Sequence, residues 1–384
     1  MRNGLETREE LFAVMEQIAE EREAARPIVR ELVARRQSID DIEIPEGWRT
    51  AGMVLELCLA AQSIDEADPS KSLSLLHIAL AITQSTSRRG HPPLLDICLE
   101  ATTWNDIGWQ HFYLGTFDAA LRAYTTAESK FASTAALYHE FARAKLRHAQ
   151  ALAYIRQDSH ALRLIAESKD IFHDFGDDLR IAMAEVIRAT LHYLRGEIGI
   201  ASSEYESLLS MKDRLDPRTL AAVYLNLGLT YVNLGRLSDA LSAFEIGRDL
   251  FVESGIPLYR IDWGLARVQL ENGEFAQAIA NLKRLRDTFL KRKMSHDAGL
   301  VGLDIVEALI ATDRFSEARR LTEQVLSEFQ DAKLHNEAIT SLAYLRDLIP
   351  KSQDARSAVR TVRSYVERTS YARSMFYLTP DERN

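Results

Sequence analysis

The chain has 384 residues, 46% of them hydrophobic, and 47 Lys and Arg against 56 Asp and Glu give a net charge of −9. Because the charges are spread along the chain, this balance argues against a general nucleic-acid binder. Only two cysteines occur, Cys58 and Cys98, which argues against a disulfide scaffold and favours a reducing cytoplasm.

Residues 1–48 predict an N-terminal helical cap and a linker. Apolar residues recur at helical spacing from Thr7 to about Arg36, and Pro27 is expected to kink or divide this helix. Gln37 to Trp48 lacks helical phase and is interpreted as the linker. Two roles are open for the helix: it covers the exposed face of the next helix pair, or it docks a partner or a second copy of the chain.

Residues 49–92 predict a degenerate first helix pair, with helices at Thr50–Ser63 and Pro69–Ser85. Leu59 and Ala60 are expected at the packing positions of the first of these helices. The turn Ser87–Pro93, which holds a glycine and two prolines, is the strongest break in the chain.

No segment predicts a signal sequence or a membrane span. The N-terminus carries charges throughout, and the longest apolar stretch, near Ala51–Ala61, is interrupted by Glu56. The protein is therefore expected to be soluble and cytoplasmic.

Residues 93–331 contain six copies of a two-helix unit, of which Ala221–Pro257 is the clearest. One helix face of this copy carries Tyr224, Leu227, Gly228 and Tyr231. A glycine inside a helix costs about 1 kcal/mol relative to alanine, so another backbone is expected to pack against Gly228. The turn at Gly235 ends this helix, and the second helix presents a facing stripe of Ala240, Phe244 and Gly247.

Four positions of the unit recur. The alanine after the turn returns every 38 to 41 residues, at Ala120, Ala161, Ala201, Ala240, Ala278 and Ala318. The small residue of the first helix is Gly108, Ala149, Ala189, Gly228 and Ala266, and the departure from it is Val306. The turn glycine is Gly115, Gly196, Gly235 and Gly273, with Arg156 and Asp313 in its place in two units. The large residue of the second helix is Tyr124, Ile165, Tyr205, Phe244 and Leu282, with Thr322 as the departure.

This pattern resembles the tetratricopeptide (TPR) signature, which has an aromatic, a leucine and a glycine on the first helix and an alanine and an aromatic on the second. The period exceeds the usual 34 residues of that family, so the chain looks like a long-period bacterial type. The resemblance implies an all-α fold: a right-handed α-α superhelix, the TPR-like solenoid of stacked antiparallel helix pairs.

Residues 332–384 predict a C-terminal helical cap and tail, with helices at His335–Leu348 and Asp354–Thr369. The end is basic, with arginines at Arg356, Arg360, Arg363, Arg368 and Arg373. It is interpreted as a solvated, frayed cap. The alternative is a peptide-like tail that inserts into another molecule.

Motifs for catalysis, metals and cofactors are missing from the sequence. His139-Glu140 begins like a zinc-binding HExxH helix, but Arg143 stands where the second histidine is needed. His173, Asp174, Asp177 and Asp178 form a small cluster that is interpreted as a solvated turn. Neither a phosphate-binding glycine loop nor a GxSxG elbow occurs. We therefore expect a protein without enzymatic activity, metal or cofactor.

The resemblance implies that the first helix of each pair lines a concave groove that holds a partner. The residues that its pattern places there are Asn105, Trp109, Phe112, Tyr113, Arg143, Gln150, Tyr154, Tyr193, Arg260, Trp263 and Arg267. Aromatic residues and arginine dominate interface hot spots. Alternatively, these aromatics belong to the core between repeats. The groove hypothesis predicts that Trp109→Ala together with Trp263→Ala weakens partner capture while leaving helicity near wild type.

The sequence favours a non-catalytic scaffold or adaptor that binds a protein or peptide in bacterial signalling or transcription regulation. Nucleic acid and membrane are not expected as partners, and homo-oligomerisation is left open. The alternative is a regulator that senses a ligand or peptide and transmits the change through its N-terminal helices.

Overall fold

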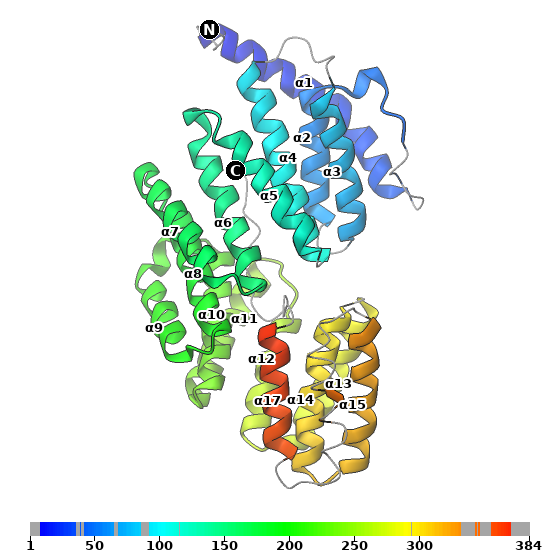
Figure 1. Cartoon of the computed structure of the whole chain (residues 1–384), viewed down its shortest axis with the longest axis vertical. Coiled ribbons are helices and arrows are strands. Elements are labelled where there is room, and N and C mark those ends of the chain that lie inside the picture. Colours follow the sequence, from blue (N-terminus) through cyan, green and yellow to red (C-terminus); the bar gives the residue numbers. More distant parts are fainter. Residues whose placement is uncertain are drawn as a thin grey trace. The chain divides into compact units, whose positions relative to one another are not determined.

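The computed structural model describes residues 8–35, 39, 42–64, 68–85, 92–114, 116–292, 294–331, 342, 343, 345 and 355–369. All regular structure in these ranges is helical (Figure 1). The chain divides into two compact units, residues 1–153 with 159–176 and residues 154–158 with 177–384.

Helices follow one another in sequential pairs, which confirms the predicted all-α, TPR-like fold. The α-helices as far as residue 175 are α1 (Arg8–Ala34), α2 (Ala51–Ile64), α3 (Pro69–Gln84), α4 (Pro93–Leu114), α5 (Phe117–Phe131), α6 (Tyr138–Tyr154) and α7 (Asp158–Phe175). The later ones are α8 (Asp178–Leu194), α9 (Ile198–Leu208), α10 (Pro217–Asn233), α11 (Leu237–Glu253), α12 (Tyr259–Glu271), α13 (Phe275–Lys291), α14 (Ser295–Ala311), α15 (Phe315–Asp331) and α17 (Ala355–Thr369). Short 3-10 turns are η1 (Glu46–Trp48), η2 (Ala135–Leu137) and η3 (Leu209–Arg214).

The six alanines that set the repeat register are all fully buried. They lie on α5, α7, α9, α11, α13 and α15, the second helices of the pairs. Side chains of this size allow neighbouring helices to approach closely, because nothing larger fits at the contact. The predicted register is therefore confirmed at its most regular position.

The small residue of each first helix makes room for a ring of the second helix. A Cβ at Gly228 would lie 2.5 Å from Cε1 of Phe244, and a Cβ at Gly108 would lie 2.7 Å from the same atom of Tyr124. The expectation that a backbone packs against Gly228 is wrong, since an aromatic side chain fills that space. Phe244 also meets the next repeat, because a Cβ at Gly264 of α12 would lie 2.4 Å from its Cζ.

The turns within the pairs share one backbone conformation. Gly196, Gly235 and Gly273 have φ of 80°, 71° and 79°, in the left-handed region that glycine adopts at little cost. Arg156 and Asp313 adopt the same conformation, with φ of 62° and 57°. The two units that lack the glycine therefore keep its turn. The predicted turn glycine Gly115 and most of the predicted break at Ser87–Pro93 lie outside the described residues.

Helix α1 packs against α2 in the first unit (Figure 1). The backbone N–H of Gly52 donates to Oε2 of Glu21 over 2.9 Å, and a Cβ at Gly52 would lie only 2.4 Å from Cβ of Glu21. Pro27 lies inside the helix and does not divide it. The C-terminal half of α1 thus covers α2, the first of the two roles left open for it.

The predicted register of the first helix pair needs one correction. Leu59 is 40% exposed, and the core positions of α2 are instead Leu57, Cys58 and Ala61. This helix carries apolar residues on most of its surface, so its sequence does not define a single stripe. Cys58 is buried and Cys98 is half-buried.

Candidate partner-binding surface

We call the surface formed by the first helices of the pairs the A-helix face. In the first unit it includes α4 and α6, and in the second unit α8, α10, α12 and α14. The predicted groove residues fall on both units.

In the first unit, the predicted residues Asn105, Trp109, Phe112, Arg143 and Gln150 are all buried. The rings of Trp109 and Phe112 stack with centroids 5.6 Å apart. Arg143 forms an ion pair with Glu140 over 2.7 Å within α6. Tyr113 lies in α4, but its side chain lies outside the described part of the structure.

A buried ion pair underlies these residues and was not among the predicted groove positions. Nη1 of Arg147 donates to Oδ1 of Asp106 over 3.0 Å, and the guanidinium lies over the Trp109 ring at 5.2 Å. Gln62 of α2 donates to the other oxygen of Asp106 over 3.1 Å. The pair links three helices, α2, α4 and α6, across the A-helix face. An aspartate and an arginine 41 residues apart, one repeat period, are the sequence signal for it.

Two buried acceptors on α4 lack a partner among the described residues. Oδ1 of Asn105 and Oε1 of Gln110 are enclosed and accept no hydrogen bond. Leaving such a group unpaired costs about 1–3 kcal/mol.

In the second unit, Tyr154, Tyr193, Arg260, Trp263 and Arg267 are likewise buried. The phenol oxygen of Tyr193 accepts from Nδ2 of Asn233 over 2.6 Å. Trp263 donates from its indole nitrogen to Oδ2 of Asp304 over 2.6 Å. Nη1 of Arg267 has no hydrogen-bond partner among the described residues.

Trp109 and Trp263 are 5% and 1% exposed, so both belong to the cores of their units. Removing a buried tryptophan costs about 3–5 kcal/mol of stability, and the double alanine variant would lose folding together with binding. Asn105 and Gln150 are almost as buried, at 6% each, but their side chains are smaller, so truncating them leaves a smaller void and makes them the better positions at which to test partner capture.

Helix α17 lies against the A-helix face of the second unit, next to α14 (Figure 1). Nη2 of Arg360 donates to both carboxylate oxygens of Glu271, over 2.9 and 2.8 Å. Nε of Arg360 donates to Glu307 over 2.5 Å, and Nε of Arg356 donates to the same carboxylate over 3.1 Å. Arg363 pairs with Asp304.

The interpretation of the C-terminal arginines as a solvated cap is therefore wrong for Arg363, whereas Arg356 and Arg360 are paired and keep 38% and 43% of their side chains exposed. Each is paired with an acid of α12 or α14, and Arg363 is only 5% exposed. Four parts of this predicted end lie outside the described residues: the side chain of Arg368, Arg373, the tail after Thr369 and nearly all of the predicted helix at His335–Leu348.

The carboxylates that receive these arginines are deeply placed. Asp304 and Glu307, one turn apart on α14, are 1% and 2% exposed. Burial raises the pKa of Glu307, and the positive charge of Arg360 opposes that effect. Acidic residues on a first helix resemble a solvated face in the sequence, which is why their spacing alone does not reveal the site.

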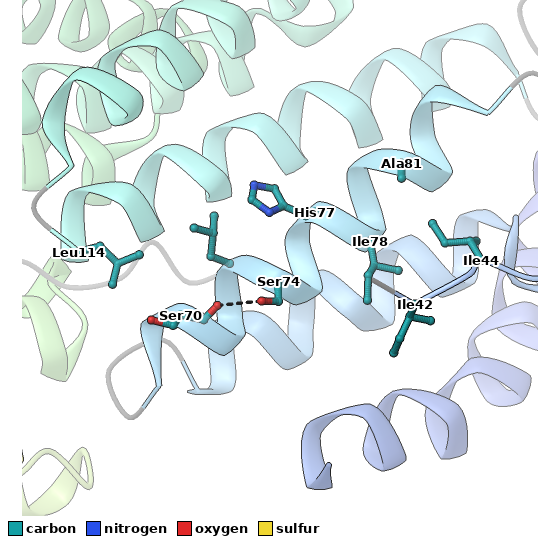
Figure 2. Close-up of a pocket in the computed structure, with 9 residues that line it drawn as sticks. Ile42, Ile44, Ser70, Ser74, His77, Ile78, Ala81 and Leu114 are labelled. Atoms are coloured by element: carbon teal, nitrogen blue, oxygen red, sulfur yellow. Dashed lines mark hydrogen bonds between the residues drawn. The ribbon is translucent and has the colours of Figure 1, made fainter. Parts of the chain in front are cut away.

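An open cavity of about 560 Å³ lies in the first unit (Figure 2). Its walls are mostly apolar and come from three places: Ile42 and Ile44 of the segment after α1, Leu114 at the end of α4, and Ser70, Leu73, Ser74, His77, Ile78 and Ala81 of α3. Within it, the hydroxyl of Ser74 donates to the carbonyl of Ser70 over 3.2 Å. The cavity thus lies between the predicted linker and the first helix pair.

Neither a metal cluster nor a membrane helix is found in the described ranges. There, no three His, Cys, Asp or Glu side chains are grouped to hold a metal ion. Asp177, one of the four clustered residues at 173–178, instead caps α8 by accepting from the backbone of Arg180 over 3.1 Å. No helix in these ranges is both long and apolar enough to cross a bilayer.

Comparison with solved structures supports the repeat fold. A Rap protein complexed with competence and sporulation factor has a TM-score of 0.56 and 16% identity, covering 89% of this chain and 99% of that chain. Aspartyl phosphate phosphatase F from Bacillus subtilis has a TM-score of 0.46 and 14% identity, covering 92% and 97%. BtubC from P. vanneervenii has a TM-score of 0.44 and 19% identity, covering 63% and 92%.

No family model and no curated protein matches the chain. At identities this low the likeness establishes the fold, a TPR/Rap-like helical repeat, and not the function.

Proposed function

We propose that the chain is a non-catalytic regulator that binds a protein or peptide partner on its A-helix face, in bacterial signalling or transcription regulation. The groove residues of the first unit, with Asn105 and Gln150 as the polar contacts, are the proposed site. Tyr154, Tyr193, Arg260, Trp263 and Arg267 are their proposed counterparts in the second unit.

The observation that carries the proposal is the pair of unpartnered acceptors on α4. Oδ1 of Asn105 and Oε1 of Gln110 are buried beside a charged cluster, where helix packing alone would favour apolar side chains. Rotation of either side chain toward the face would let the backbone N–H groups of a peptide supply the missing donor. The Rap protein of the comparison was crystallised with a peptide factor, which supports this class of partner.

Peptide-library panning on the immobilised full chain tests the proposal. Peptides that it selects are expected to lose at least tenfold in affinity when Asn105→Ala or Gln150→Ala is introduced, because the first removes one of the two unpartnered acceptors and the second removes a predicted polar groove residue. Gln324→Ala, at an exposed position of α15, is the matched control and should leave the affinity unchanged. Peptides that bind equally well to all three variants would place the site elsewhere.

The ligand-sensing alternative is favoured by the cavity at Ile42, Ile44 and His77 (Figure 2). A ligand there would touch both the segment after α1 and α3, so binding would alter the segment that connects the N-terminal helix to the first pair. Limited trypsin digestion with and without a selected peptide discriminates the two functions. A change in cleavage at Arg35 and Arg49 supports the sensor, and an unchanged pattern supports the scaffold.

A further inference from the structure

Helix α17 carries two parallel stripes that make it suited to a groove. Its apolar stripe consists of Ala355, Val359 and Val366, all buried, with Val362 partly buried between them. Arg356, Arg360 and Arg363 form a second stripe at i, i+4 and i+7, one residue further along the chain. Ser357 and Thr361 are exposed on the opposite side. An amphipathic helix of this kind binds by laying its apolar face into a groove.

The surface beneath α17 is built to receive positive charge. Asp304 and Glu307 are nearly inaccessible, and two carboxylates in such a position repel each other unless cations lie beside them. Among the described residues, the cations within ion-pair distance of Glu271, Asp304 and Glu307 are the three arginines of α17. The acceptor site therefore depends on a basic helix to compensate its charge.

The site is assembled from residues far apart in the sequence. The hydrogen bonds join residues 49 to 89 positions apart, and 23 residues separate the end of α15 from the start of α17. A helix of the same chain binds such a site as an intramolecular ligand, and Leu342 and Leu345 of the connecting residues are buried in the same core. A second helix with the same charge pattern can compete for the site in trans.

We infer that α17 is the resident occupant of a basic-helix acceptor site made by Glu271, Asp304 and Glu307, and that an arginine-bearing amphipathic helix of a partner protein displaces it. This inference rests on the proposed function, since it names the chemistry of the partner at one part of the A-helix face. The recognised pattern is arginine at i, i+4 and i+7 beside an apolar stripe.

A labelled peptide with the sequence of residues 354–369 tests the inference by fluorescence anisotropy with the full chain. The wild-type chain is expected to bind it weakly, because its own α17 fills the site. Arg356→Ala with Arg360→Ala loosens the resident helix and should tighten peptide binding at least tenfold. Adding Glu307→Gln to that variant should abolish the increase in peptide affinity. A peptide with its arginines replaced by glutamate is the control ligand, and Arg319→Ala, in an exposed pair on α15, is the control variant.

Hydrogen exchange provides the second measurement. Saturating peptide is expected to speed amide exchange in α17 by at least tenfold while α13 and α15 stay protected. Glu271→Gln, which removes one acceptor of Arg360, should speed exchange of α17 even without peptide. Loss of the cooperative thermal transition in the double arginine variant, or peptide binding that leaves α17 protected, would overturn the inference and make α17 an integral helix of the second unit.

Failure of this inference can be told apart from failure of the proposed function. Library-selected peptides that depend on Asn105 and Gln150, but neither need Glu307 nor release α17, overturn the inference alone. A chain that binds neither those peptides nor the α17 peptide overturns both.

Discussion

At the scale of single residues, the turn between paired helices shows that packing overrides local preference. Arg156 and Asp313 hold the left-handed conformation that glycine holds elsewhere, although a side chain in this region costs about 1–2 kcal/mol. Packing of the surrounding helices offsets this conformational cost. Sequence reasoning treats these two units as weak because it reads the residue type and not the packing around it.

Asp313→Gly is expected to stabilise the chain by about 0.5–1 kcal/mol, since the strain relieved exceeds the extra unfolded-state entropy of glycine. Urea denaturation measures the change. Gly235→Ala, at the equivalent turn, should cost a similar amount, because no atom lies within 4 Å of the added Cβ and only the positive φ opposes it. A destabilised Asp313→Gly variant would show that the carboxylate contributes to the fold.

The two departures in the sixth unit change side-chain size in opposite directions. Val306 and Thr322, both fully buried, occupy the positions at which Gly228 and Phe244 meet in the fourth unit. A larger residue on the first helix therefore goes with a smaller one on the second. Position-by-position comparison counts two mismatches here, whereas opposite changes of size at a shared contact would conserve the space between the helices.

Val306→Ala and Thr322→Leu should each destabilise the chain, by about 1–3 kcal/mol, the first by leaving a void and the second by overfilling. Combined, they recreate the pairing found at Ala266 and Leu282 and should recover about 0.5–3 kcal/mol relative to additivity. A double-mutant cycle in urea measures this coupling. Strict additivity would mean that the two side chains do not share a space.

At the scale of helices, the sequence predicts where elements lie better than what they contact. The predicted helices at 50–63 and 69–85 are observed at 51–64 and 69–84. Periodicity and caps are local, so they define such boundaries well. The ion pairs of α17 join residues 49 to 89 positions apart, and an amphipathic pattern does not say which surface a helix covers.

The candidate groove shows the same limit. Helix phase places Trp109, Tyr193 and Trp263 on the A-helix face. How deeply each side chain is buried depends on the neighbouring repeats, and helix phase gives no information about these. All three are buried. The acids Asp304 and Glu307 were not predicted because their cationic partners lie on a distant helix.

Tyr231 joins α10 to α9 and predicts a pH dependence of stability. Its hydroxyl donates to Oε1 of Glu206 over 2.9 Å, and burial together with this acceptor raises its pKa to about 12. Above the ordinary pKa of 10, the unfolded chain releases a proton that the folded chain keeps, so stability should fall as the pH rises from 10 to 12.

Chemical denaturation between pH 9 and 12 measures this dependence, and Tyr231→Phe should flatten the part that belongs to this residue. Glu206→Gln should lower the pKa of Tyr231, which the phenolate absorbance difference between each variant and its Tyr231→Phe counterpart reports. An unchanged pKa would mean that burial alone sets it.

At the scale of the whole molecule, the chain consists of two compact units built from repeats. The destabilising effect of a substitution is therefore expected to stay near the substituted repeat. Stability in such arrays is a sum of repeat and nearest-neighbour contributions, so a fault in one pair spreads chiefly to adjacent pairs. The composition and length of the chain do not reveal the division into units, because the repeat pattern runs through residues 153–177 without interruption.

Gly264→Ala is expected to raise amide exchange in α10–α13 while leaving α2–α5 unchanged, because the added methyl group meets the ring of Phe244. Mass-spectrometric hydrogen exchange resolves the two regions. Gly247→Ala is the matched control, since its nearest neighbour is the flexible end of Ile261 at 3.2 Å, and its effect should be smaller. Faster exchange throughout α2–α5 would contradict local behaviour.

The ring of Phe244 touches a glycine in its own pair and another in the pair that follows. A repeat transplanted with this phenylalanine into a chimaeric array therefore needs glycine at two positions. One lies on its own first helix, and the other lies on the first helix of the next repeat. Successive repeats of this chain therefore cannot be exchanged one at a time. A junction for exchanging them should lie C-terminal to Gly264.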